Sequence, residues 1–223
     1  MPLQDFADFT LGGLAALFPV IDPIGSVPIF LVLTAGIPQA LRRSYAKRIA
    51  INVVLLLIGF LLVGGGILRF FGISLEVVRI AGGIVVFHAA WNTMNATSKL
   101  SDLENEAAAQ RAGQHEDISF MPMTMPLLAG PGSIAVALGL AAEASRGAPP
   151  LETAQNLLAI SLAIALIGLV IYVALRSSSL LLKWFGAGGI HALSRLLGLF
   201  VMAIGVQLIL NGIGDWIESL SLG

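Results

Sequence analysis

Asp22 is the one charged side chain that falls clearly in the middle of a long apolar stretch, within FPVIDPIGSVPIF. A carboxylate at membrane depth costs about 2.5 to 3.5 kcal/mol on insertion scales, so another group must compensate it. The candidates are a substrate ammonium, a coupling cation, a proton, or an arginine such as Arg79 or Arg195. The first three give Asp22 a function, and the last gives it a structural role.

Prolines and glycines interrupt two apolar stretches near their middles, in FPVIDPIGSVPIF and in MPMTMPLLAGPGSIA. Proline has no N–H to donate and glycine permits non-helical dihedral angles. Freed backbone groups at this depth are tolerated only where protein or a water-filled cavity satisfies them. We therefore predict two facing, unwound hinges that line a polar cavity, with two kinked but continuous helices as the alternative. The residues concerned are Pro23, Gly25, Pro28, Pro126, Gly130, Pro131 and Gly132.

Together these groups suit an amino-acid zwitterion. Half-helices that restart after Gly25 and Gly132 direct unpaired N–H groups and positive dipole ends at a carboxylate, while Asp22 and freed carbonyls hold the ammonium. The small residues around the hinges leave room for a small, neutral side chain only. The predicted substrate-binding residues are Asp22, Pro23, Gly25, Ser26, Thr124, Gly130, Pro131, Gly132 and Ser133.

The composition requires a membrane. Of 223 residues, 57% are hydrophobic and 11% are charged, against roughly 25% charged in soluble domains. The net charge of -1 and the lack of a basic patch argue against a nucleic-acid partner. There is no cysteine, which excludes thiol catalysis and thiolate metal sites. The first ten residues have no basic n-region or cleavage site, so we expect no removable signal peptide.

Six stretches reach the roughly 20 apolar residues that a spanning helix needs. We predict an all-α membrane protein with one transmembrane domain over 1–223, in which repeat 1 covers about 9–95, a cytoplasmic loop about 96–119 and repeat 2 about 120–214. Loops are expected at LRRSYAKR and between RSSS and GAGG. The predicted spans are 9–34, 49–71, 74–95, 120–142, 154–175 and 192–213.

Two pairings indicate an internal repeat. Pro19 and Pro23 match Pro122 and Pro126 at an offset of 103, and a Gly-Ser follows each pair. An offset of 116 aligns the third span with the sixth through Arg79 with Arg195, Gly82 with Gly198, Ala89 with Gly205, Asn95 with Asn211 and Ala96 with Gly212. Three spans per repeat is an odd number, so the second copy must be inverted. The small residues recur every seven positions, which predicts close helix packing along Gly82 and Ala89 and along Gly198 and Gly205.

DPIGSVPIF and PLLAGPGSIA, taken together, resemble the MarC family of inner-membrane proteins, and the similarity covers nearly the whole chain. The resemblance implies six spans in a 3+3 inverted repeat, with discontinuous helices 1 and 4. It also implies transport of glycine- or alanine-like substrates, as in some members. Family members often carry asparagine where this chain has Asp22, which favours a hydrogen-bonding role there.

We therefore expect a secondary transporter of small neutral amino acids in the inner membrane, with Na+ or H+ as candidate coupling ions and no other cofactor. A passive channel, or an exporter of another small polar solute, is the alternative. An intramembrane enzyme using Ser133 with His88 or His191 is a distant third, and we expect no enzyme and no metal site. The sequence leaves the oligomeric state open, a homo-oligomer included.

The basic residues predict the orientation. Nine are expected on the cytoplasmic side and three on the other, which places both termini in the periplasm. Green fluorescent protein inserted within 96–119 should therefore fluoresce, and the same protein fused to the C-terminus should not. A fluorescent C-terminal fusion would contradict both the orientation and the even number of spans. The nine are Arg42, Arg43, Lys47, Arg48, Lys99, Arg111, Arg176, Lys183 and Arg195, and the three are Arg69, Arg79 and Arg146.

Overall fold

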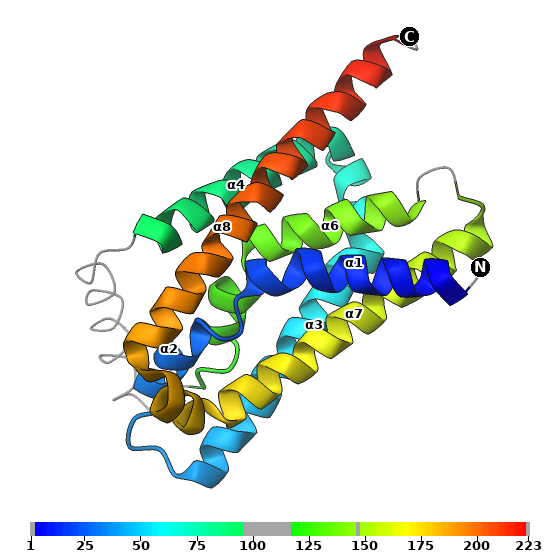
Figure 1. Ribbon diagram of the computed structural model, residues 1–223. Helices are drawn as coiled ribbons and strands as arrows, with labels where there is room; N and C mark the ends of the chain where they lie inside the picture. The colour runs from blue at the N-terminus through cyan, green and yellow to red at the C-terminus, as the bar shows by residue number, and fades with distance from the viewer. Residues whose placement is uncertain (1–2, 96–116, 146–147, 222–223) are drawn as a thin grey trace.

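A computed structural model describes residues 3–95, 117–145 and 148–221, and within these ranges every regular element is a helix (Figure 1). Most of the predicted loop 96–119 and the basic residues Lys99, Arg111 and Arg146 lie outside the described residues. The elements are α1 (Leu3–Ile21), α2 (Ser26–Leu33), α3 (Gln39–Phe70), α4 (Leu75–Asn95), the π-helical turn η1 (Met123–Leu128), α6 (Pro131–Ser145), α7 (Pro150–Arg176) and α8 (Ser178–Ser221).

Among the described residues, four helices are long and apolar enough to cross a membrane: α3, α4, α7 and the Gly188–Leu220 part of α8. A fifth candidate is α1 together with α2, which meet at a bend of 52°. The predicted span 120–142 is divided between η1 and α6, in line with the interruption expected within it. With 15 residues, α6 is about 22 Å long, shorter than the roughly 30 Å hydrocarbon core. The chain is thus a multi-pass membrane protein with four to five candidate spans.

Helix ends differ from the predicted spans where charged residues continue a helix beyond its apolar part. The predicted loop at LRRSYAKR belongs to α3, which begins at Gln39. The predicted loop between RSSS and GAGG belongs to α8, whose only interruption is Gly186, with φ 64° and ψ 168°. Hydropathy marks the part of a helix that lies in lipid, whereas basic and small polar residues remain compatible with helix outside it. The predictions of loops at these two places were wrong.

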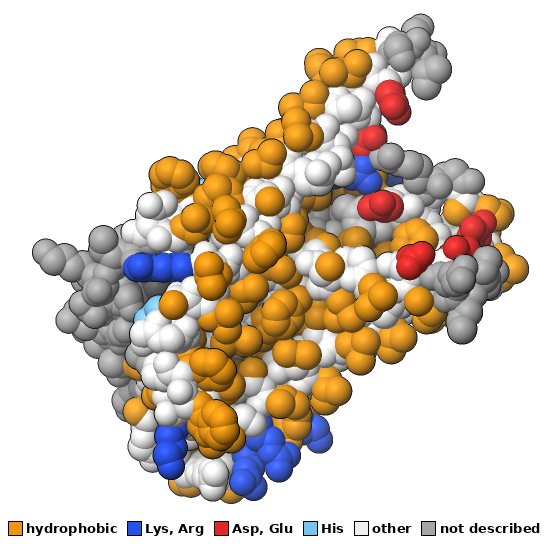
Figure 2. Space-filling view, viewed as in Figure 1, with side chains coloured by type: hydrophobic (Ala, Val, Ile, Leu, Met, Phe, Trp, Pro, Cys, Tyr) orange, Lys and Arg blue, Asp and Glu red, His pale blue; other side chains and the backbone are white. Residues whose placement is uncertain are grey.

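Charge is divided between the two ends of the bundle. On the face shown in Figure 2, most Lys and Arg side chains gather at one end and most Asp and Glu side chains at the other. The basic end holds the start of α3 and the end of α7, and the labelled chain ends in Figure 1 lie toward the acidic end. At the basic end, Arg42 donates to the Thr34 carbonyl over 3.1 Å and so caps the last turn of α2.

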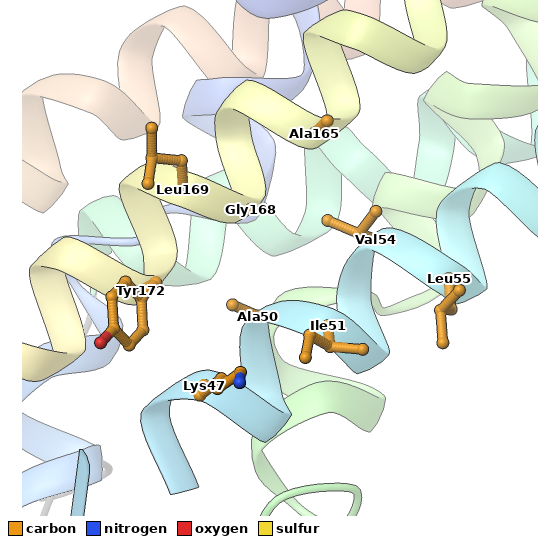
Figure 3. Close-up of a pocket in the computed structure, with 9 residues that line it drawn as sticks. All are labelled: Lys47, Ala50, Ile51, Val54, Leu55, Ala165, Gly168, Leu169 and Tyr172. Carbon is orange, nitrogen blue, oxygen red and sulfur yellow. The ribbon is translucent and has the colours of Figure 1, made fainter. Parts of the chain in front are cut away.

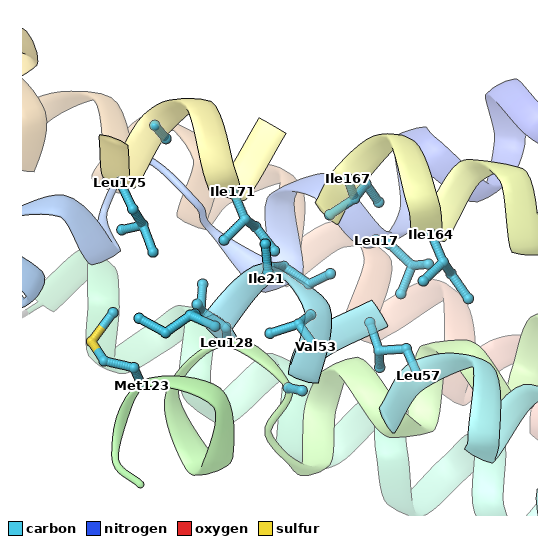
Figure 4. Close-up of a cluster of buried hydrophobic side chains, with 14 of the residues drawn as sticks. Leu17, Ile21, Val53, Leu57, Met123, Leu128, Ile164, Ile167, Ile171 and Leu175 are labelled. Atoms are coloured by element: carbon cyan, nitrogen blue, oxygen red, sulfur yellow. The ribbon is translucent and has the colours of Figure 1, made fainter. Parts of the chain in front are cut away.

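Packing joins the first half of the chain to the second. α4 lies along α8, α3 along α7, and α1 against α7, while α6 contacts both α3 and α4. Thr10 links α1 to α7 through the Ala159 carbonyl at 3.3 Å, and Asn156 links α7 to α6 through the Ala144 carbonyl at 3.1 Å. Figure 4 shows the central apolar cluster, in which side chains of α1, α3, α7 and η1 meet.

Backbone contact between α4 and α8 forms a glycine seam. A Cβ added at Gly205 would lie 2.7 Å from the Phe87 nitrogen and 2.9 Å from the Gly83 oxygen, and one at Gly83 would lie 2.6 Å from the Gly205 oxygen. Seven residues later, a Cβ at Gly212 would lie 2.8 Å from the Glu76 oxygen, and seven residues earlier, one at Gly198 would lie 2.9 Å from the Met94 side chain. The helices are antiparallel, since Gly198 meets the end of α4 and Gly212 its beginning.

The predicted close packing is confirmed at Gly82, Gly198 and Gly205 and wrong at Ala89. Gly198 and Gly205 both face α4. On α4, however, Gly82 faces Ala135 of α6, and Ala89 is exposed. The α4 side of the seam lies one residue later, at Gly83 and the buried Ala90. An alignment by residue type does not define which helix face a small residue occupies, and adjacent glycines leave this choice open. Ala96, matched to Gly212, lies outside the described residues.

A buried ion pair closes the acidic end of the seam. The Arg79 side chain is 6% exposed and forms a salt bridge with Asp215 of α8, which is 18% exposed. Removing one partner of a buried pair leaves an uncompensated charge, which costs far more than a surface pair contributes. This contact fixes the register of α4 against α8.

Replacement of Gly205 by alanine tests the seam. The added Cβ meets backbone atoms, which cannot rotate away, so Gly205→Ala should lower the free energy of unfolding in detergent by about 1 to 3 kcal/mol. Gly214→Ala on the same helix is the matched control, because a Cβ there has nothing within 4 Å, and alanine is the better helix former. Equal thermal stability of both variants would show that α4 and α8 do not touch through their backbones.

Candidate functional site

The first helix break lies between Ile21 and Ser26. Asp22 has φ 44°, the left-handed conformation that aspartate tolerates better than most residues, and the following Pro23 has no N–H to continue the helix. The Asp22 Oδ1 atom accepts the Gly25 N–H at 2.9 Å, and its carbonyl accepts the Ser26 N–H at 3.2 Å. The Ser26 hydroxyl donates to the Pro23 carbonyl at 2.8 Å. Within this break, four residues thus satisfy one another's polar groups.

Neighbouring prolines do not break the helix. Pro19 lies inside α1, and Pro28 lies in the first turn of α2, where its missing N–H has no intrahelical partner to lose. The predicted hinge is therefore confirmed in its place, and it is confined to the Asp22–Gly25 segment.

The second break precedes α6. Gly130 lies against the Pro126 carbonyl, which an added Cβ would approach to 2.3 Å. The Ser133 hydroxyl donates to the Leu128 carbonyl at 2.9 Å, as Ser26 does to Pro23 at the first break. Thr124 is fully buried and donates to the Ser119 carbonyl at 2.6 Å. Both breaks thus use a serine of the new helix to satisfy a carbonyl of the interrupted segment.

The segment that leads into this break is anchored at the basic end. Asp117 forms a 2.9 Å salt bridge with Arg48 of α3, and its other oxygen accepts the Ser119 N–H. The Ser119 hydroxyl, followed by the Ser119 N–H and Arg48, lowers the pKa of Asp117 below its ordinary value. Both partners are about half exposed, so this pair positions the segment more than it stabilises the fold.

The two breaks are neighbours in space. A Cβ added at Gly132 would lie 3.6 Å from Val20 of α1 and 3.2 Å from Val86 of α4. α1 contacts α6, and α2 contacts η1. Gly25, Ser26, Gly132 and Ser133, which lie far apart in the sequence, therefore begin two helices that meet inside the bundle.

Asp22 forms no ion pair with any residue that the structure describes. Arg79 is paired with Asp215 instead, and Arg195 is exposed. The neighbour of Asp22 is Ser194 of α8, close enough to interact with the carboxylate. Ser194 is 8% exposed and its Oγ lacks a hydrogen bond of standard geometry. A Cβ at Gly25 would lie 2.0 Å from Asp22 Oδ2 and 2.5 Å from Ser194 Oγ, so these three residues pack as one unit.

Sequence reasoning missed Ser194. A single serine in an apolar helix carries no spacing or motif signal, and it reaches Asp22 only because α8 packs beside α2.

Pro131 was predicted as a site residue, but the structure places it away from Asp22. It is the first residue of α6, where proline is favoured, but it is exposed in a groove of about 460 Å³ between α4 and α6, among apolar side chains. The structure does not bring Pro131 to Asp22.

The polar side chains at the two hinges are bonded within the protein. The hydroxyls of Ser26, Thr124 and Ser133 all donate to backbone carbonyls. Among the described residues, one groove lies between α4 and α6 and another between α3 and α7, and apolar side chains dominate both. Ligand access to the breaks therefore requires these hydrogen bonds to rearrange.

The groups considered for catalysis do not form a reactive pair. Ser133 is buried and bonded to the Leu128 carbonyl, while His88 and His191 are exposed. The His88 side chain lies on the outer surface of α4. Across the ranges that the structure covers, no group of three His, Cys, Asp or Glu residues is placed to hold a metal ion.

This arrangement defines a helical membrane protein in which two interrupted helices meet at their breaks. The chain belongs to the MarC family: the model described as "MarC family integral membrane protein" matches residues 7–217.

Its relatives are membrane proteins of similar length. It is 37% identical over 199 residues to a UPF0056 membrane protein of Methanocaldococcus jannaschii, covering 89% of this chain and 93% of the relative. It is 31% identical over 217 residues to the UPF0056 inner membrane protein MarC of an Escherichia coli strain, covering 93% and 95%. The UPF0056 membrane protein YvbG of Bacillus subtilis is 31% identical over 198 residues, covering 89% and 90%. No solved structure matches the chain.

Adding a methyl group at Gly25 tests whether Asp22, Gly25 and Ser194 pack as one unit. Gly25→Ala should displace the Asp22 carboxylate from the Gly25 N–H and lower the thermal stability in detergent. Gly12→Ala in α1 is the matched control, since a Cβ there meets nothing within 4 Å. Asp22→Gly keeps the left-handed backbone without strain, so adding it to Gly25→Ala should recover part of the loss. A purely additive double mutant would mean that the two side chains do not interact.

Proposed function

We propose that the protein is a secondary transporter of small neutral amino acids such as glycine and alanine. The observation that carries this proposal is the contact of two helix breaks inside the bundle, one of which bears a carboxylate with no ion-pair partner among the described residues. Interrupted helices that meet near the midplane are the usual substrate sites of transporters. An unpaired acid at this depth marks a functional site for a cation.

The helix contacts support a 3+3 inverted repeat with six spans. If α1 with α2 and η1 with α6 are each one interrupted span, then the contact of α1 with α7 has its counterpart in that of α6 with α3. When the two halves of the chain are exchanged, the contact of α4 with α8 corresponds to itself, and so does the contact of α3 with α7. A two-fold axis in the membrane plane relates such halves in known transporter folds.

The chemistry of the two breaks fits a zwitterion. Asp22 and Ser194 offer a carboxylate and a neighbouring hydroxyl to an ammonium group. The first turns of α2 and α6 present N–H groups and the positive ends of their dipoles to a carboxylate. Val20 and Val86 approach Gly132 closely, which leaves no room for a large side chain. A small neutral amino acid meets all three conditions.

A carrier fits the packing better than a passive channel does. Ile21 and Leu128, which directly precede the two breaks, are fully or almost fully buried in the apolar cluster of Figure 4. A channel needs a continuous polar path, and this cluster blocks one. In a carrier, substrate or a coupling Na+ or H+ replaces the internal bonds of Ser26 and Ser133 as the hinge opens. The Escherichia coli relative is named an inner membrane protein, and we propose the same location, with both termini in the periplasm.

Counterflow in proteoliposomes tests the proposal. Vesicles loaded with unlabelled glycine should accumulate labelled glycine and alanine, and an excess of glycinamide, which lacks the carboxylate, should not compete. Asp22→Asn should reduce the rate about tenfold or more, the equivalent of about 1.4 kcal/mol for a charged contact.

Asp5→Asn is the matched control, because Asp5 is an exposed acid near the start of α1. Full activity of Asp22→Asn would assign that position to hydrogen bonding instead of charge. Absence of counterflow with every neutral amino acid, from protein that binds no labelled glycine, would overturn the proposed substrate.

A further inference from the structure

We infer that the groove between α3 and α7 binds an anionic phospholipid, with an acyl chain along its apolar floor and the phosphate at Lys47. The groove has a volume of about 520 Å³ and runs along both helices, as Figure 3 shows. It is separate from the helix breaks, so the inference does not rest on the transport function.

The apolar part of the groove is shaped by small residues. A Cβ at Gly168 would lie 2.3 Å from the Val54 side chain and 3.6 Å from the Ala50 oxygen, so α7 touches α3 at the bottom of the groove. Ala165 and Ala50 leave space above this contact, and Ile51 and Leu169 form its walls. From Lys47 to Leu55 the groove follows α3 for about 12 Å, a length suited to a segment of acyl chain.

The end of the groove near the basic end of the bundle is cationic. Lys47 lines it, is exposed, and has no ion pair in the part of the chain that the structure covers. Across the groove, the Tyr172 hydroxyl accepts a hydrogen bond of 2.6 Å from Arg176, whose guanidinium lies 5.6 Å from the ring centroid. A lysine and an arginine on facing helices thus flank the place where an acyl chain would leave the groove. Basic pockets between membrane helices on the cytoplasmic side recognise anionic head groups.

The shape and surroundings of the groove favour lipid over a second copy of the chain. It opens on a face where Leu55, Leu158 and Leu169 are more than half exposed, a surface suited to hydrocarbon. Two copies that met symmetrically on this face would set one concave groove against another and one Lys47 near its equivalent. Such a contact leaves a void and repelling charges, whereas a phospholipid fills the groove and neutralises Lys47.

Native mass spectrometry of the full chain in detergent, with equal phosphatidylglycerol and phosphatidylcholine of the same acyl chains, tests the inference. Wild-type protein should retain phosphatidylglycerol at least fivefold over phosphatidylcholine. Lys47→Gln should remove most of this preference, and Arg69→Gln, an equal charge change on α3 at the opposite end, should keep it. Ala165→Phe fills the groove and should reduce retention of both lipids, unlike Ala203→Phe at an exposed alanine of α8.

Each alternative occupant has a distinct result. Glycerol 3-phosphate, a head group without chains, should not bind, and its binding would show an anion site instead of a lipid site. Equal retention of the two lipids by the wild type, or an unchanged preference in Lys47→Gln protein that retains wild-type thermal stability, would overturn the inference. A dimer that Ala165→Phe dissociates would assign the groove to a second copy.

Discussion

Every polar backbone group inside the bilayer must find a partner within the protein, and the two helix breaks exist only because their own residues supply these partners. At the first break, Asp22 accepts the Gly25 N–H and Ser26 donates to the Pro23 carbonyl. At the second, Ser133 satisfies the Leu128 carbonyl. These internal bonds satisfy the polar groups of both breaks, and they are the bonds that the proposed zwitterionic substrate would replace. Under that proposal, the stability of this conformation and the affinity for substrate depend on the same polar groups.

Two acidic side chains in the bundle differ in whether a basic side chain pairs with them. Asp215 is held by Arg79 at the acidic end of α4 and α8, where the pair is largely removed from solvent. Asp22 lies in the first helix break, where its carboxylate accepts the Gly25 N–H and has Ser194 beside it. Because the arginines that were considered as its partner are engaged or exposed elsewhere, Asp22 has no ion-pair partner within the described ranges. The structure thus separates the acid that fixes helix packing from the acid that faces the break.

Long apolar runs and the proline and glycine of the first break were the most predictable features of this fold. Apolar length located the third and fifth spans, and Pro23 with Gly25 located the first break. Predictions that depended on direction were less accurate: with adjacent glycines at 82 and 83, the sequence does not show which one faces α8. Pro131 shares the glycine-rich motif yet lies on the outer surface. Ser194 joins Asp22 only through tertiary packing, which no local pattern records. The predicted helix ends were wrong where the apolar run stops but residues with good helix propensity continue.

The glycine seam has a mechanical consequence. Side-chain interfaces can slide in small steps because rotamers adjust, but Gly83 and Gly205 meet through backbone atoms that have no rotamers. Glycines recur on α8 every seven residues, so the next register at which α8 again presents a glycine lies about 10 Å away. Between those registers, Cβ atoms would strike the opposing backbone. α4 and α8 must therefore move as one rigid unit, and any relative motion within the bundle takes place in the shorter helices that carry the breaks.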